Sequence, residues 1–145
     1  MDALKLLALD QDDLAIISAH VQDGVFKVGD ISFSARAGQL SIVLNRFVWE
    51  KAQRKQKSFE RRRAAITFKR VNAVRSIGFD RSKREEVLSL LAIRFVQDGD
   101  GPEGRIEVLL SGGGTISMDV EVIEVQLADT GGAWETGFMP SHPGN

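Results

Sequence analysis

The stretch that decides the fold class is ISFSARAGQLSIVLNRFVW, residues 31–49. Apolar and polar residues alternate on both sides of a short Ala-Gly-Gln turn at residues 37–39. The alternating apolar residues are Ile31, Phe33 and Ala35 before the turn, and Leu40, Ile42 and Leu44 after it. A period of two is typical of β-strands, so the stretch predicts an antiparallel hairpin. If Leu44 faces the core, Arg46 continues the same face.

Strand-like segments continue on both sides of this hairpin. They lie at residues 4–7, 65–77, 87–96, 106–110 and from 116 onward, with a bulge near residues 71–74. Glycine-rich or charged turns separate the later segments at residues 80–86, 97–104 and 112–114. There is no alternation of strands with helices, so a parallel sheet is not expected. The sequence predicts an α+β fold, an antiparallel meander of six to seven strands curled into a barrel or a two-layer sandwich.

A helix is predicted near each end of the meander. Leu14, Ile17 and Val21 share one helical face, Asp10 or Asp12 can cap the helix, and Gly24 can end it. Residues 119–128 fit either a strand or a helix, and we expect a strand ending near Val120 followed by a short helix. This C-terminal helix would make the fold similar to the pleckstrin-homology arrangement. We expect one globular domain over residues 1–132 and a loose tail over residues 133–145.

The formal net charge of −1 conceals a strong asymmetry along the chain. Residues 46–84 contain 14 basic and 3 acidic side chains, a charge of +11, and the remaining residues carry −12. We expect the two signs to occupy opposite faces of the protein. The chain contains no cysteine, which excludes disulfides, thiolate metal sites and cysteine nucleophiles and favours a cytoplasmic location.

The densest basic run is the strongest candidate for a binding site. Its predicted binding residues are Trp49, Lys51, Arg54, Lys55, Lys57, Arg61, Arg62 and Arg63. Residues 50–63 have no apolar period and predict a long exposed loop, whose basic part is 51–63. The loop could bind an acidic protein surface or a second copy of the chain, or nucleic acid or another polyanion. It could also be a solvated loop that prevents aggregation at a sheet edge.

Several stretches resemble the alphaproteobacterial family known as domain of unknown function 2948. The more specific ones are residues 44–50 (LNRFVWE) and 88–95 (LSLLAIRF). The others are residues 7–10, 18–23, 61–63, 74–76 and 123–129. The resemblance covers roughly residues 4–134 and implies a small bacterial cytoplasmic protein. The family has no assigned activity, so the resemblance implies no catalytic residue here.

No catalytic or metal-binding signature stands out in the sequence. A small enzyme or ligand carrier would need a pocket at the barrel mouth, and the candidate residues for it are His20, Arg46 and Arg94. The acidic residues at 10–13 are better explained by helix capping than by a metal ion. We therefore expect no cofactor, no metal and no membrane association, and consider a binding or adaptor domain more consistent with the sequence than an enzyme.

Overall fold

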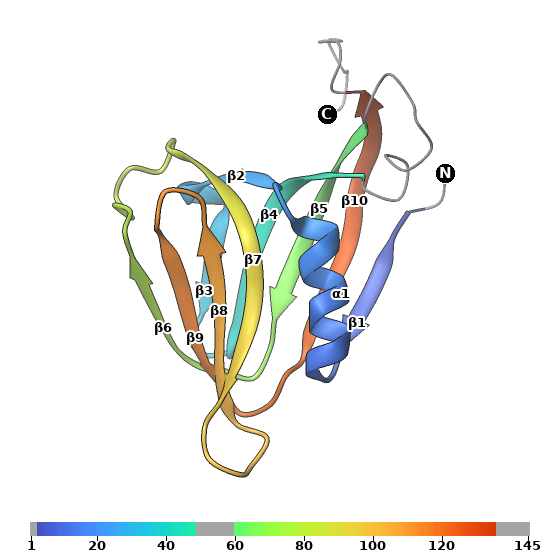
Figure 1. The fold of residues 1–145 in the computed structure, drawn as a ribbon. Helices are drawn as coiled ribbons and strands as arrows, with labels where there is room; N and C mark the ends of the chain where they lie inside the picture. Colours follow the sequence, from blue (N-terminus) through green and yellow to red (C-terminus); the bar gives the residue numbers. More distant parts are fainter. Residues whose placement is uncertain (1–2, 49–59, 136–145) are drawn as a thin grey trace.

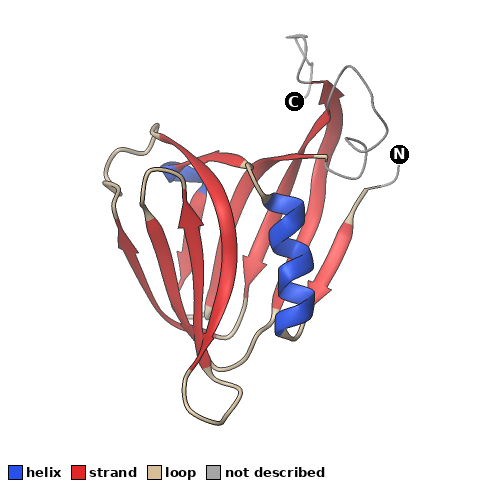
Figure 2. Ribbon diagram, in the orientation of Figure 1, coloured by secondary structure: helices blue, strands red, loops and turns tan. Residues whose placement is uncertain are grey.

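The computed structural model describes residues 3–48 and 60–135. Within these ranges the chain forms ten strands, one α-helix and one short 3-10 helix (Figures 1 and 2). The elements are β1 Lys5–Ala8, α1 Gln11–Val21, β2 Val25–Lys27, η1 Val28–Asp30, β3 Ile31–Ser34, β4 Gln39–Phe47, β5 Glu60–Phe68, β6 Val71–Ile77, β7 Val87–Gln97, β8 Gly104–Leu110, β9 Thr115–Val120 and β10 Val125–Glu135. The mostly antiparallel fold predicted from the sequence is confirmed. No helix in the described ranges is long and apolar enough to cross a membrane.

The strands form one open sheet in the order β1-β10-β5-β4-β2-β7-β8-β9-β6, with β3 paired to β4. The terminal strands β1 and β6 do not pair, so the sheet does not close into a barrel, which was one of the two predicted forms. The predicted antiparallel pairing of consecutive strands is present in two places. β4 pairs with β3 and β5, and β8 pairs with β7 and β9. The chain is not a simple meander, because β10 returns to lie between β1 and β5. The predicted count of six to seven strands is too low, because it omits β2 and β10 and treats β5 and β6 as the single segment 65–77.

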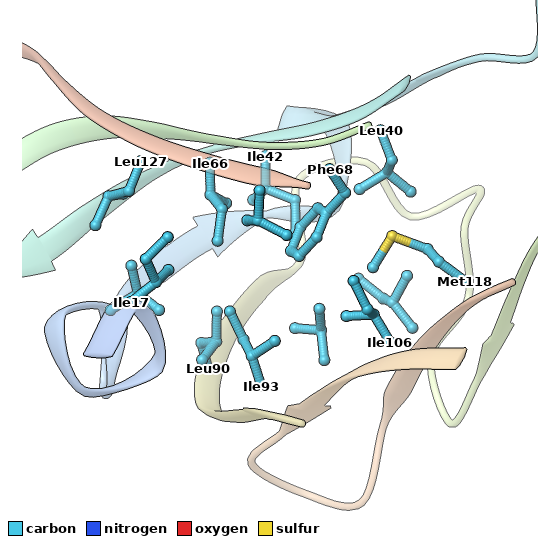
Figure 3. Close-up of a cluster of buried hydrophobic side chains, with 14 of the residues drawn as sticks. Ile17, Leu40, Ile42, Ile66, Phe68, Leu90, Ile93, Ile106, Met118 and Leu127 are labelled. Atoms are coloured by element: carbon cyan, nitrogen blue, oxygen red, sulfur yellow. The ribbon is translucent and has the colours of Figure 1, made fainter. Parts of the chain in front are cut away.

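The sheet bends so that its two halves face each other across one hydrophobic core (Figure 1). Phe68 and Leu127 enter this core from one half, and Ile106 and Met118 enter it from the other (Figure 3). Ile17 of α1 packs at the side of the same cluster, where the helix contacts both β7 and β1. The helix thus covers an opening that the two halves leave at that side.

The N-terminal helix forms as predicted, with one difference at its end. Asp10 is the N-cap, and its carboxylate accepts a hydrogen bond of 2.8 Å from the backbone N–H of Asp13. Leu14, Ile17 and Val21 are buried. The residue in the left-handed region after the helix is Asp23, with φ 63°, and not Gly24. Gly24 is needed for close packing, because a Cβ there would lie 2.9 Å from the carbonyl oxygen of Val21.

The predicted C-terminal helix is wrong. Residues 125–135 form β10, which pairs with β1 on one side and with β5 on the other. Val125 and Leu127 are both fully buried, as alternation in a central strand requires. Two flanking strands thus favour the extended conformation over a locally possible helix. The main reason for comparing the fold with pleckstrin-homology domains is thereby removed. Three residues of the predicted tail, 133–135, belong to β10, and residues 136–145 lie outside the described ranges.

The predicted exposed loop is also too long at its C-terminal end. Glu60 and the three arginines after it belong to β5, where Arg61, Arg62 and Arg63 pair with residues of β4. The other predicted binding residues, Trp49, Lys51, Arg54, Lys55 and Lys57, lie outside the described ranges.

Candidate functional site

The arginine triplet at the start of β5 is divided between the two faces of the sheet. Successive side chains of a strand point to opposite faces. Arg62 is accordingly buried, while Arg63 is exposed on the outer face. Arg61 shares that outer face, donates hydrogen bonds to the carbonyl oxygens of Asp23 and Asn45, and lies 5.8 Å from the ring centroid of Phe47. Only part of the triplet is therefore available to a partner.

Arg62 belongs to a buried ionic cluster with Arg46 and Asp129. Arg46 donates from Nε to Asp129 Oδ1 at 2.8 Å and from Nη2 to Oδ2 at 3.1 Å, a bidentate pair with both side chains 0% exposed. Arg62 Nη1 lies 3.5 Å from Asp129 Oδ2. The backbone N–H of Leu4 donates to the same oxygen at 2.8 Å. One carboxylate thus connects β4, β5, β10 and the segment leading into β1.

The cluster holds Asp129 in its ionised form. Burial raises the pKa of the Asp129 carboxyl, but the hydrogen bonds from Arg46 and Leu4 and the charges of both arginines lower it by more in total. The pKa of Asp129 is therefore below its ordinary value. Because the carboxylate is the form that both guanidiniums bind, its protonation would remove the negative charge that Arg46 and Arg62 share.

Acidification is expected to remove the stabilisation that Asp129 provides. A carboxyl whose pKa is lowered by folding stabilises the protein above the pKa of the unfolded chain, about 3.9, and loses this effect as the pH falls through the lower folded value. Urea unfolding of the natural protein and of Asp129→Asn, from about pH 6 down to about pH 2.5, tests this. The difference between the two free energies of unfolding should shrink below about pH 4. If the difference between the two free energies of unfolding stayed constant over this pH range, the stabilising role of the ionised Asp129 would be contradicted.

Other cations of the basic segment also pair with acidic residues from the C-terminal third. Arg75 lies 2.9 Å from Asp119, and Arg70 lies 3.4 Å from Glu124. Strand pairing explains this, because β6 pairs with β9 and β5 pairs with β10. The expectation that the two signs occupy opposite faces is therefore wrong for these residues. Among the described residues, cations of the basic segment thus pair with three acidic side chains of the C-terminal third, Asp119, Glu124 and Asp129.

Arg63 differs from these paired cations. It is exposed and makes no ion pair with any residue of the described ranges. Together with Asn45 and Lys27 it lines a depression of about 260 Å³ on the outer face of β2, β4 and β5. Lys27 is already paired with Glu85 at 2.8 Å, and Asp30 also lines the depression. Arg63 is thus the cation of this depression that has no ion-pair partner among the described residues.

The three residues proposed for a barrel-mouth pocket do not come together. Arg46 is fully buried in the ionic cluster. Arg94 is on the exposed side of β7 and pairs with Glu107 at 2.7 Å. The His20 ring nitrogen Nδ1 lies 2.9 Å from the carbonyl oxygen of Ile16, one turn earlier in α1. None of the three lines the surface depression at Arg63. Among the described residues there is also no group of three potential metal ligands.

The fold and this site define a mostly antiparallel β protein with a hydrophobic core, a buried arginine–aspartate cluster, and an exposed arginine near the start of β5 that has no ion pair among the described residues. The chain belongs to the family described as "Protein of unknown function (DUF2948)", which matches residues 4–142. The family suggested by the sequence is thereby confirmed. No curated protein and no solved structure matches the chain.

Proposed function

We propose that this protein is a non-enzymatic binding domain that engages an acidic surface, on a partner protein or on a second copy of itself. The binding surface comprises Arg63 and the outer face around it. We also include in the proposed binding region the basic run that precedes β5 in the sequence, Lys51, Arg54, Lys55 and Lys57. The absence of cysteine is consistent with a reducing cytoplasm as the place where this binding occurs.

The observation that carries the proposal is the distribution of paired and unpaired cations. Arg46, Arg62, Arg70 and Arg75 are matched by acidic side chains of the same chain. Arg63 has no such match in the described ranges, and it lies next to the strongest concentration of positive charge in the sequence. An uncompensated cluster of one sign attracts a surface of the other sign and speeds its association.

Charge reversal of Arg63 tests the proposal. Arg63→Glu should weaken association several-fold and reduce its dependence on salt, because exposed charges are screened at physiological ionic strength. Sedimentation velocity at low and physiological salt measures self-association, and affinity capture from a bacterial lysate measures partner binding. Arg36→Glu is the matched control, because Arg36 is exposed in the β3–β4 turn and makes no ion pair within the described ranges.

Two outcomes would contradict the proposal. In the first, sedimentation shows a monomer at low salt, and Arg63→Glu still captures every protein that the natural chain captures. The other is an equal loss with Arg36→Glu, which would indicate a general charge effect. A labelled single-stranded oligonucleotide distinguishes the polyanion alternative, since binding would then weaken with salt at a log–log slope of about −0.7 per phosphate contact.

A further inference from the structure

A second cavity lies where the open sheet leaves two strand edges unjoined. β3 pairs only with β4, and β6 pairs only with β9 among the described strands. β6 ends the sheet at the left of Figure 1. Between the two edges is a cavity of about 300 Å³. This is the lower end of the size range of small-molecule sites, about 300–1,000 Å³.

The walls of this cavity are mainly apolar. Phe33 is paired with Leu40, which is buried in the core, so Phe33 also faces inward, yet it remains 40% exposed. On the opposite edge Val74 and Ser76 stand next to the core residues Met118 and Ile116. Inward-facing apolar side chains that remain accessible to water are the kind of surface that an apolar ligand covers favourably.

Two cations line the same cavity. Arg81 and Arg84 come from the segment between β6 and β7. Arg84 is oriented by a hydrogen bond from Nη2 to the carbonyl oxygen of Gly29 at 3.3 Å, and Arg81 makes no ion pair with the described residues.

The acidic side chains nearest to these arginines in the sequence have other partners. Asp80 accepts hydrogen bonds from the backbone N–H and hydroxyl of Ser82, at 2.9 and 2.7 Å. Glu85 pairs with Lys27. Neither Asp80 nor Glu85 lines the cavity, whose two charged lining residues are both basic.

We propose that this cavity binds a small amphipathic anion, with its apolar body between β3 and β6 and its acidic head on Arg81 and Arg84. A guanidinium binds a carboxylate or a phosphate through parallel hydrogen bonds, so either head is compatible with the site. The volume equals about ten water molecules at about 30 Å³ each, which suits a ligand of about ten non-hydrogen atoms. This site is separate from the Arg63 surface and does not depend on it.

A titration with octanoate, monitored through the amide signals in NMR spectra, tests the proposal. The same titration is carried out with octyl phosphate and with octanol. Octanoate or octyl phosphate should bind and shift the amides of β3 and β6, and the stronger of the two identifies the head group. Arg81→Gln should weaken that binding about tenfold or more, because it removes a charged hydrogen bond. Lys83→Gln, an exposed change in the same segment outside the cavity, should leave it unaltered.

Three results would overturn the proposal. The first is that neither anion shifts β3 and β6. The second is that octanol binds as tightly as the anions, which would mean that the arginines do not recognise the head group. The third is that Lys83→Gln weakens binding as much as Arg81→Gln does. Thermal melts of the variants confirm that each one is folded during the titration.

Discussion

Replacement of Asp129 with asparagine is expected to lower the free energy of unfolding by about 3–5 kcal/mol, the usual cost of removing one partner from a buried ion pair. The carboxylate is completely buried and is shared by Arg46 and Arg62. Asparagine keeps the shape of the side chain, so the change removes the charge without opening a cavity. The variant would therefore lack the negative charge that two buried guanidiniums share. Urea unfolding near neutral pH measures the effect.

Asp119→Asn is the matched control for this experiment. Asp119 pairs with Arg75 at a similar distance, 2.9 Å, but both side chains are about half exposed. An exposed pair contributes about 0–1 kcal/mol, so this variant should lose far less stability than Asp129→Asn. Equal losses for the two variants would mean that the burial of the cluster has no energetic importance.

Replacement of Phe68 with alanine is expected to cost about 3–5 kcal/mol of unfolding free energy. Phe68 is fully buried, and its side chain extends from β5 toward the opposite half of the sheet (Figure 3). Its removal leaves a cavity between the two halves that they cannot close without disturbing the strand pairing. Guanidinium unfolding measures the loss.

Phe33→Ala provides the control for Phe68. Phe33 also faces inward, but at the unjoined edge where it is 40% exposed, so its truncation should cost clearly less. If Phe68→Ala were no more destabilising than Phe33→Ala, the two halves of the sheet would not share one tightly packed core.

The features that could be predicted from the sequence are those that depend on neighbouring residues. The alternation in residues 31–49 identified β3 and β4, and it also placed Arg46 on the inner face. The acidic cap and the apolar spacing identified α1. The bulge expected near residues 71–74 is present in β6, between Val71 and Ala73. In each case the local pattern and the final environment favour the same conformation.

The features that were missed depend on partners far away in the sequence. Residues 119–128 satisfy both a helical and a strand pattern, and only the pairing of β10 with β1 and β5 decides between them. Asp129 is 83 residues from Arg46, so no spacing rule connects them. The same long-range pairing brings Arg70 beside Glu124 and Arg75 beside Asp119. Composition revealed their opposite charges but could not show that their strands are neighbours.

A double-mutant cycle on Arg46 and Asp129 tests most directly the claim that a buried ion pair between residues distant in the sequence stabilises the packing of β4 and β10. The cycle compares Arg46→Met, Asp129→Asn and the double variant by urea unfolding. We predict that the double variant is much less destabilised than the sum of the two single variants, with a coupling of at least about 1.5 kcal/mol. A coupling near zero would contradict the account.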